Sequence, residues 1–182
     1  MTAMVDPLIH VAAAGFIVVV LARAVGGKLH DYALYTATLT DYRLLPAVVV
    51  PAAAAGLVTA EALAVVLLLV PSASAVGAAL AMALFGLYGL AMALALFGGR
   101  TEIECGCGGE GQLVSWGLVA RNAVLVGISG SLILPMTARA MGWLDFLFGA
   151  VAVAVVCLLL AIAEKTIGTA AVIRRLDTHS YH

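Results

Sequence analysis

Long apolar stretches separated by short polar segments dominate the pattern of this chain. Five of them approach or exceed the roughly 20 apolar residues that a helix needs to cross a bilayer: residues 8–25, 46–70, 73–97, 116–136 and 143–162. Every intervening segment is shorter than about 25 residues, too short for a second domain. The pattern predicts an all-α polytopic membrane protein of one domain, a four-helix bundle core with a fifth transmembrane helix on its side.

The polar segments differ in character. Residues 26–45 mix charges with three tyrosines, which is typical of an amphipathic segment lying at the headgroup level. Residues 163–182 form a polar C-terminal tail. Within the spans, small residues around Gly56 and Gly86 predict faces where helices pack closely.

Composition agrees with a membrane protein. Of the 182 residues, 64% are hydrophobic and 10% are charged, more apolar surface than a soluble domain of this size could bury. The formal net charge of -1 argues against nucleic-acid binding, which needs a basic face. The first apolar run lacks a basic flank and a cleavage site, so we expect a retained helix rather than a signal peptide.

Charge asymmetry predicts an orientation. Five crossings place residues 26–45, the segment around Cys105 and the C-terminus on one side, with eight of the nine Lys and Arg residues. Arg139 is the cation of the other side. The positive-inside rule then places the N-terminus outside, and the C-terminus and the cysteine segment in the cytoplasm.

Cys105, Gly106 and Cys107 carry the clearest candidate chemistry. Two thiols in a wet glycine-rich loop indicate thiol-disulfide exchange, capture of a soft metal, or two free surface thiols. No further Cys or His completes a tetrahedral site, so we expect no metal. A disulfide across one residue is strained and therefore labile, which favours exchange. Arg100 and Arg121 would favour thiolates, whereas the neighbouring glutamates would oppose them.

Glu61 is the carboxylate set well inside a predicted span, where a charge is costly. It should face the bundle and either stay protonated or pair. It could serve as a proton relay, as a contact for a quinone or a partner, or as a helix-helix hydrogen bond. Because burial favours the neutral form, Glu61→Gln should fold nearly normally.

Arg121 and Asn122 open the buried part of the fourth span. Helix rise puts Arg121 about 15 Å from Glu61 in depth, so we expect Arg121 to serve the cysteine loop or a lipid phosphate instead. Cys157 in the fifth span is interpreted as a small core residue, with a third redox partner as the alternative.

Several segments together resemble the methylamine utilisation protein MauE family, relatives of the DoxX-like membrane proteins. The resemblance covers residues 8–140, and its most specific part is the Cys-Gly-Cys loop followed by Arg121-Asn122. The other matching segments are Gly27-Lys28-Leu29, residues 41–46, Glu61 and Gly98-Gly99-Arg100. It implies an integral membrane protein that accompanies a thioredoxin-like protein and takes part in forming disulfides in the small subunit of methylamine dehydrogenase. That role implies redox work on the outer side, opposite to the charge count.

Two functions follow. The first is a membrane thiol-disulfide oxidoreductase using Cys105 and Cys107, supported by Glu61, Arg100, Arg121 and Asn122, with electrons passing to or from a quinone in the bundle. The second is a non-catalytic membrane anchor or accessory subunit of a respiratory or dehydrogenase complex, with the cysteine loop as a contact.

Overall fold

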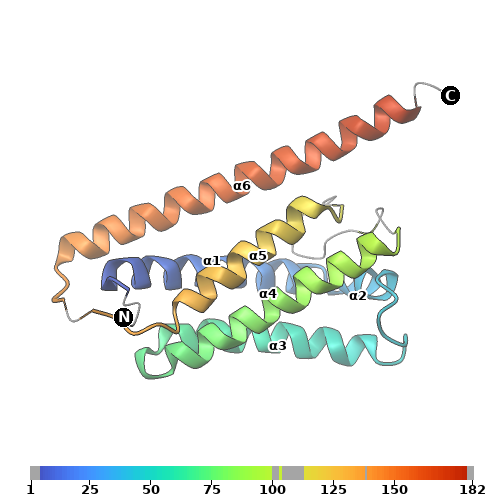
Figure 1. The fold of residues 1–182 in the computed structure, drawn as a ribbon. Coiled ribbons are helices and arrows are strands. Elements are labelled where there is room, and N and C mark those ends of the chain that lie inside the picture. The colour runs from blue at the N-terminus through green and yellow to red at the C-terminus, as the bar shows by residue number, and fades with distance from the viewer. Residues whose placement is uncertain (1–4, 100–102, 104–112, 138, 180–182) are drawn as a thin grey trace.

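The computed structural model describes residues 5–99, 103, 113–137 and 139–179, and no β-strand occurs among them. The elements are α1 (Pro7–His30), α2 (Tyr32–Asp41), α3 (Val50–Leu69), the single 3-10 turn η1 (Pro71–Ala73), α4 (Ser74–Phe97), α5 (Trp116–Ser131) and α6 (Trp143–His179) (Figure 1). The predicted all-α polytopic fold is confirmed.

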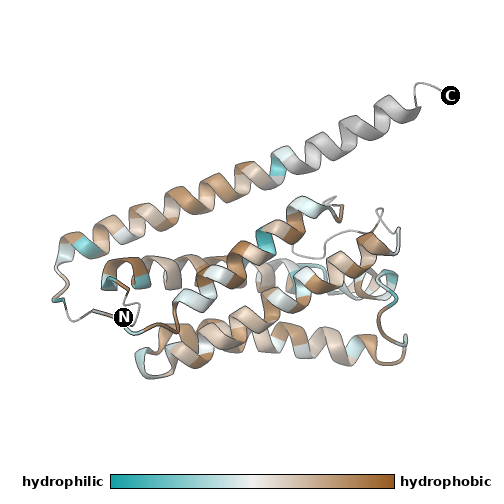
Figure 2. Ribbon diagram, in the orientation of Figure 1, coloured by the Kyte–Doolittle hydropathy of each residue, from teal (hydrophilic) through white to brown (hydrophobic). Residues whose placement is uncertain are grey.

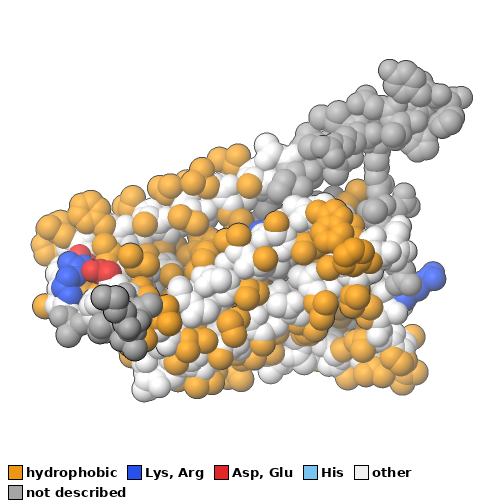
Figure 3. Space-filling view, in the orientation of Figure 1, with side chains coloured by type: hydrophobic (Ala, Val, Ile, Leu, Met, Phe, Trp, Pro, Cys, Tyr) orange, Lys and Arg blue, Asp and Glu red, His pale blue; other side chains and the backbone are white. Residues whose placement is uncertain are grey.

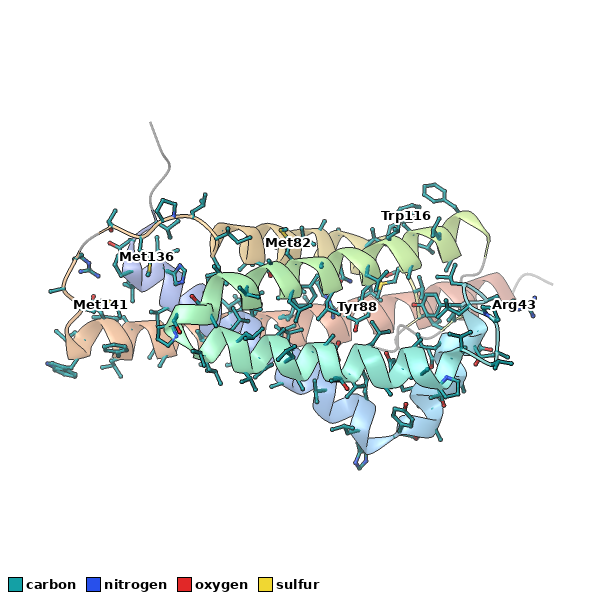
Figure 4. All side chains as sticks on the ribbon, turned by 90° about the horizontal axis from the view of Figure 1, so that it is seen from below. Arg43, Met82, Tyr88, Trp116, Met136 and Met141 are labelled. Carbon is teal, nitrogen blue, oxygen red and sulfur yellow. The ribbon has the colours of Figure 1, made fainter. Side chains whose placement is uncertain are left out.

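Helices α1, α3, α4 and α5 form the bundle, and α6 lies along α1 with its far end projecting beyond the other helices (Figure 1). Helix α1 also contacts α3 and α5, and α4 contacts α3 and α5. This is the predicted four-helix core with a fifth helix at its side. Figure 4 shows Arg43 and Trp116 at one end of the bundle and Met136 and Met141 at the other.

Four helical stretches in the described part are long and apolar enough to cross a membrane: Pro7–His30, Val50–Leu69, Pro71–Phe97 and Trp143–Ala163. Helix α5 is shorter than predicted because it ends at Ser131 instead of residue 136. Its 16 residues span about 24 Å at about 1.5 Å each, less than a hydrocarbon core of about 30 Å. The chain is therefore a multi-pass membrane protein in which α5 is a short member of the bundle.

The outward surface of the helices is as apolar as the interior. Brown, hydrophobic positions run along both sides of the helices in Figure 2, and orange side chains cover much of the face in Figure 3. On α6, Leu158 and Leu159 are 64% and 60% exposed. Such a surface suits lipid and would be an aggregation hazard in water.

The first connection contains the end of α1 and the short helix α2. Helix α1 continues through Gly26 and Gly27 to His30, five residues past its expected end. Asp31 then caps α2 by accepting a hydrogen bond from the Leu34 backbone N–H at 2.8 Å. Helix α3, which corresponds to the second predicted span, begins at Val50 instead of residue 46. Residues 26–45 thus contain a helix end, a second helix and a turn, and their place at the headgroup level stays a prediction.

The closest approach between helix backbones occurs at Gly77. A Cβ added at Gly77 would lie 2.7 Å from the Leu68 backbone nitrogen, so α3 and α4 approach each other there at backbone distance. Gly56 and Gly86 are exposed, and a Cβ added at either would meet nothing within 4 Å. The prediction of close packing fails at Gly56 and Gly86 themselves, but it holds at Gly89 of the second stretch, where an added Cβ would lie 3.3 Å from the Asn122 Cβ of α5.

Hydrogen bonds and ion pairs connect three segments at the end of the bundle where α1 begins. Asp6 caps α1 by accepting from the Leu8 N–H at 2.8 Å. The guanidinium of Arg139 donates to Asp145 at 2.9 Å and to Asp6 at 3.4 Å. The hydrogen bond to Asp145 raises the pKa of Arg139, with a further contribution from the charges of Asp145 and Asp6. The start of α1, the connection after α5 and the start of α6 are thereby joined.

Candidate functional site

Glu61 forms a buried ion pair with Lys28 in the centre of the bundle. Their side chains are 0% and 3% exposed. The Lys28 ammonium donates to Glu61 Oε1, and the Tyr88 hydroxyl donates to the same oxygen at 2.8 Å. Lys28 Nζ also donates to the Tyr88 hydroxyl at 3.1 Å. We call these three residues, from α1, α3 and α4, the buried triad.

Aromatic rings complete the surroundings of the Lys28 ammonium. It lies 5.0 Å from the Tyr35 ring centroid and 4.6 Å from that of Tyr88, within the range of cation-π attraction. Figure 4 shows Tyr88 in the interior of the bundle. The cation is thus held by a carboxylate, a hydroxyl and two rings, which together replace its lost hydration.

The depth of the triad explains why Glu61 is paired. Glu61 follows Val50 by eleven residues, about 16 Å along α3 at about 1.5 Å per residue. That is about half of a hydrocarbon core of roughly 30 Å. An isolated charge at this depth is costly, whereas a hydrogen-bonded pair is tolerated.

This pairing corrects the expectation for Glu61→Gln. Had Glu61 stood alone and protonated, the amide would have been a fair replacement. Because Lys28 faces it, the substitution leaves a buried ammonium without its counter-ion, which costs about 3–5 kcal/mol. Lys28 was not predicted as the partner of Glu61 because the first helix was expected to end at residue 25. The signal was present, since Lys28 follows the buried Leu21 by seven residues, two turns along one helix face.

A cavity of about 100 Å³ lies beside the triad. Its wall includes Glu61, Arg23, Arg121, Asn122 and Cys157. Glu61 and Arg121 therefore border the same cavity. Because α3 starts four residues later than predicted, Glu61 lies about 6 Å nearer than expected to the end where α5 begins.

Asn122 and Cys157 have distinct places in this wall. Asn122 is 1% exposed, and its Nδ2 donates to the Leu118 carbonyl at 2.9 Å and lies 3.7 Å from the Met92 sulfur. Cys157 is half-buried and packs against the core formed by α1, α3, α4 and α5. This packing agrees with the interpretation of Cys157 as a core residue.

Cys105, Cys107 and Arg100 lie outside the described residues, but Ile103 and Val114, which flank the two cysteines, are described. The Val114 N–H donates to the Ile103 carbonyl at 2.9 Å, so the chain leaves and returns at adjacent points. Ile103 and Val114 are buried in one cluster with Tyr42, Met92 and Leu118. We call Ile103 and Val114 the stem of the cysteine segment.

Fold and site together define an all-helical, multi-pass membrane protein with a buried ion pair. Its α4–α5 connection carries two cysteines between the hydrogen-bonded residues Ile103 and Val114. The family model described as methylamine utilisation protein MauE matches residues 5–135. The chain belongs to this family, which is involved in methylamine utilisation.

Individual relatives agree with this assignment. The methylamine utilization protein MauE of Paracoccus versutus is 37% identical over 85% of this chain and 84% of its own length. Its namesake in Methylophilus methylotrophus is 37% identical over 56% of this chain and 54% of its own. That of Paracoccus denitrificans is 31% identical over 69% of each. No solved structure matches the chain.

Proposed function

We propose that this protein is a membrane-embedded thiol-disulfide redox protein that acts with a thioredoxin-like partner in disulfide formation or maturation of a target protein of methylamine utilisation. The observation that carries the proposal is the Cys105-Gly106-Cys107 sequence in the connection between α4 and α5. Two thiols separated by one glycine have little use in packing. Membership of the MauE family supplies the biological setting.

The exchange proceeds through a mixed disulfide. The thiolate of one cysteine attacks the disulfide of the partner, a sulfur-sulfur bond to the partner forms, and the partner's second sulfur leaves as a thiolate. The other cysteine of the pair then attacks this mixed disulfide. The pair ends as a disulfide and the partner as a dithiol, so two electrons have moved from this chain to the partner. The reverse sequence oxidises a target.

The supporting residues are assigned by charge and place. Arg100 and Arg121 supply positive charge that favours the thiolate form of a nearby cysteine. Asn122 and Glu61 line the same cavity as Arg121, and we assign them the role of positioning Arg121 at the start of α5. These assignments belong to the proposal.

For orientation we propose an outer N-terminus and a cytoplasmic C-terminus. Lys28 is buried in the triad and paired with Glu61, so it is not counted among the charges at the membrane surface. Arg23 and Arg121 line the small cavity and leave the count as well, so five Lys and Arg residues remain against Arg139. Arg139 is itself paired with Asp6 and Asp145. The asymmetry therefore persists. In this orientation the cysteine segment meets its partner on the cytoplasmic side.

Single-cysteine variants test the function. Cys105→Ser and Cys107→Ser should each abolish exchange, and one of them should accumulate a mixed disulfide with a thioredoxin-like protein, seen as a reducible adduct on non-reducing gels and identified by mass spectrometry. Cys157→Ala is the matched control and should behave as the parent. If neither variant traps an adduct and the double variant supports full function, the accessory-subunit alternative replaces the redox one.

A further inference from the structure

A second and larger cavity lies on the other side of the buried triad. It measures about 420 Å³, within the range of about 300–1,000 Å³ typical of small-molecule sites. It lies between α2, α3 and α4, and its lining is largely apolar. Lys28 and Tyr88 line both cavities, whereas Glu61 lines the small one. Lys28 and Tyr88 thus lie between a large apolar cavity and a small one whose wall includes charged residues.

We propose that the large cavity binds a lipophilic quinone, with its ring at Lys28 and Tyr88 and its apolar tail along Leu39, Leu57 and Leu87. As an electron acceptor for Cys105 and Cys107, this quinone rests on the proposed function. Lys28 has three N–H groups and uses two of them on Glu61 and Tyr88, so one is left to donate to a quinone carbonyl.

Charge favours a quinone over a phospholipid in this cavity. Glu61 already neutralises the Lys28 ammonium, so the polar end offers a hydrogen-bond donor without net positive charge. That environment suits a neutral carbonyl and gives a phosphate no advantage. The rings of Tyr35, Tyr42 and Tyr88 also line the cavity and provide aromatic surface for a flat ring.

The cavity lies next to the stem of the cysteine segment. Tyr42 and Met92 line the cavity, and both pack in the cluster that contains Ile103 and Val114. The two residues that begin and end the cysteine segment are therefore separated from the cavity by one layer of side chains. A lipophilic acceptor in the cavity would therefore lie beside the stem of the segment that carries Cys105 and Cys107.

The reaction balances in electrons and protons. Oxidation of two thiols to a disulfide releases two electrons and two protons, and reduction of a quinone to a quinol takes up two of each. Within the described part of the chain, Glu61 Oε2 has no hydrogen-bond partner, while Oε1 accepts from Lys28 and Tyr88. The small cavity beside Glu61 is large enough for water. The triad therefore connects a water-sized chamber to the quinone oxygens and can return protons to them.

Gly56 supplies a sharp test. It lines the large cavity, and a Cβ added there meets nothing within 4 Å, so Gly56→Leu adds a side chain to the site without a clash. Leucine also has a higher helix propensity than glycine. Gly86→Leu is the matched control, because Gly86 is an exposed helical glycine with equally open space and lines neither cavity.

Binding of decylubiquinone to the purified protein in nanodiscs should be saturable in the parent, in Gly86→Leu and in the Cys105→Ser/Cys107→Ser double variant. It should weaken about tenfold or more in Gly56→Leu. In single-turnover mixing, the pre-reduced parent should reduce the quinone with loss of both thiols, whereas the cysteine double variant should bind without reducing it.

The outcomes separate the two proposals. Absence of saturable binding in the parent, equal binding by Gly56→Leu and the parent, or a retained phospholipid that the quinone does not displace would overturn the quinone site. Normal binding without any thiol-dependent reduction would leave the site in place and contradict the redox function.

Discussion

At the scale of single residues, the Lys28–Glu61 ion pair of the buried triad joins α1 to α3. Glu61 was identified because a carboxylate inside an apolar run is costly and needs a partner. Lys28 was not, because its role depends on where α1 ends, and a helix end is poorly determined by hydropathy. The pair itself is a tertiary contact between residues 33 positions apart. Only the packing of α1 on α3 brings its members together.

The ion pair predicts a non-additive mutant cycle. Lys28→Met and Glu61→Gln should each destabilise the protein by about 3–5 kcal/mol, because each leaves a buried polar or charged group without its partner. The double variant should be more stable than either single one, because no uncompensated charge remains. Thermal unfolding in detergent measures this. Arg43→Gln, which removes an exposed cation, is the control and should change stability by less than about 0.5 kcal/mol. Additive losses in the double variant would contradict the pairing.

At the scale of helices, the number, order and class of the elements were predictable because long apolar runs are a strong signal. The faces of the helices were not. Buried and lipid-facing positions are equally apolar here, so the hydropathy contrast that marks the buried face of a soluble helix is absent. The buried positions of α5 nevertheless repeat every three or four residues, at Leu118, Asn122, Leu125 and Ser129. This repeat is visible only once burial is known.

The close approach of α3 and α4 predicts opposite responses at two glycines. Gly77→Ala should destabilise the protein by about 1–3 kcal/mol, because the new Cβ would lie 2.7 Å from the Leu68 backbone nitrogen and 2.9 Å from the Leu67 carbonyl carbon. Gly86→Ala should be neutral or stabilising by up to about 1 kcal/mol, since alanine has the higher helix propensity and open space. The unfolding temperatures of both variants in detergent test this prediction. An unchanged unfolding temperature in Gly77→Ala would contradict the close packing of α3 on α4.

At the scale of the whole molecule, five helices place the two cysteine-flanking helix ends, α2 and the far end of α6 at one end of the bundle (Figure 1). The N-terminal residues, the α3–α4 turn and the α5–α6 connection lie at the other. The relative placement of these segments follows from the fold. Which end faces the cytoplasm depends on the charges at the two ends.

Reporter fusions test the orientation. A cytoplasm-active reporter joined after His182 should be active, and a reporter active only outside the cytoplasm should be silent there, because Lys and Arg favour the cytoplasmic side. The same pair of reporters in the connection near Arg139 should give the opposite result. The reverse pattern would place the cysteine segment on the outer side.

The central claim is that Cys105 and Cys107 form a redox-active pair. The most direct measurement is intact-mass analysis of the protein extracted from membranes after thiol labelling, with Cys157→Ala as the background so that the pair carries the remaining thiols. Protein from cells kept under reducing conditions should carry two labels, and protein from cells kept under oxidising conditions should carry none. Both labels are gained or lost together because forming the disulfide consumes both thiols and reducing it restores both. A protein that accepts both labels under every condition would contradict the account.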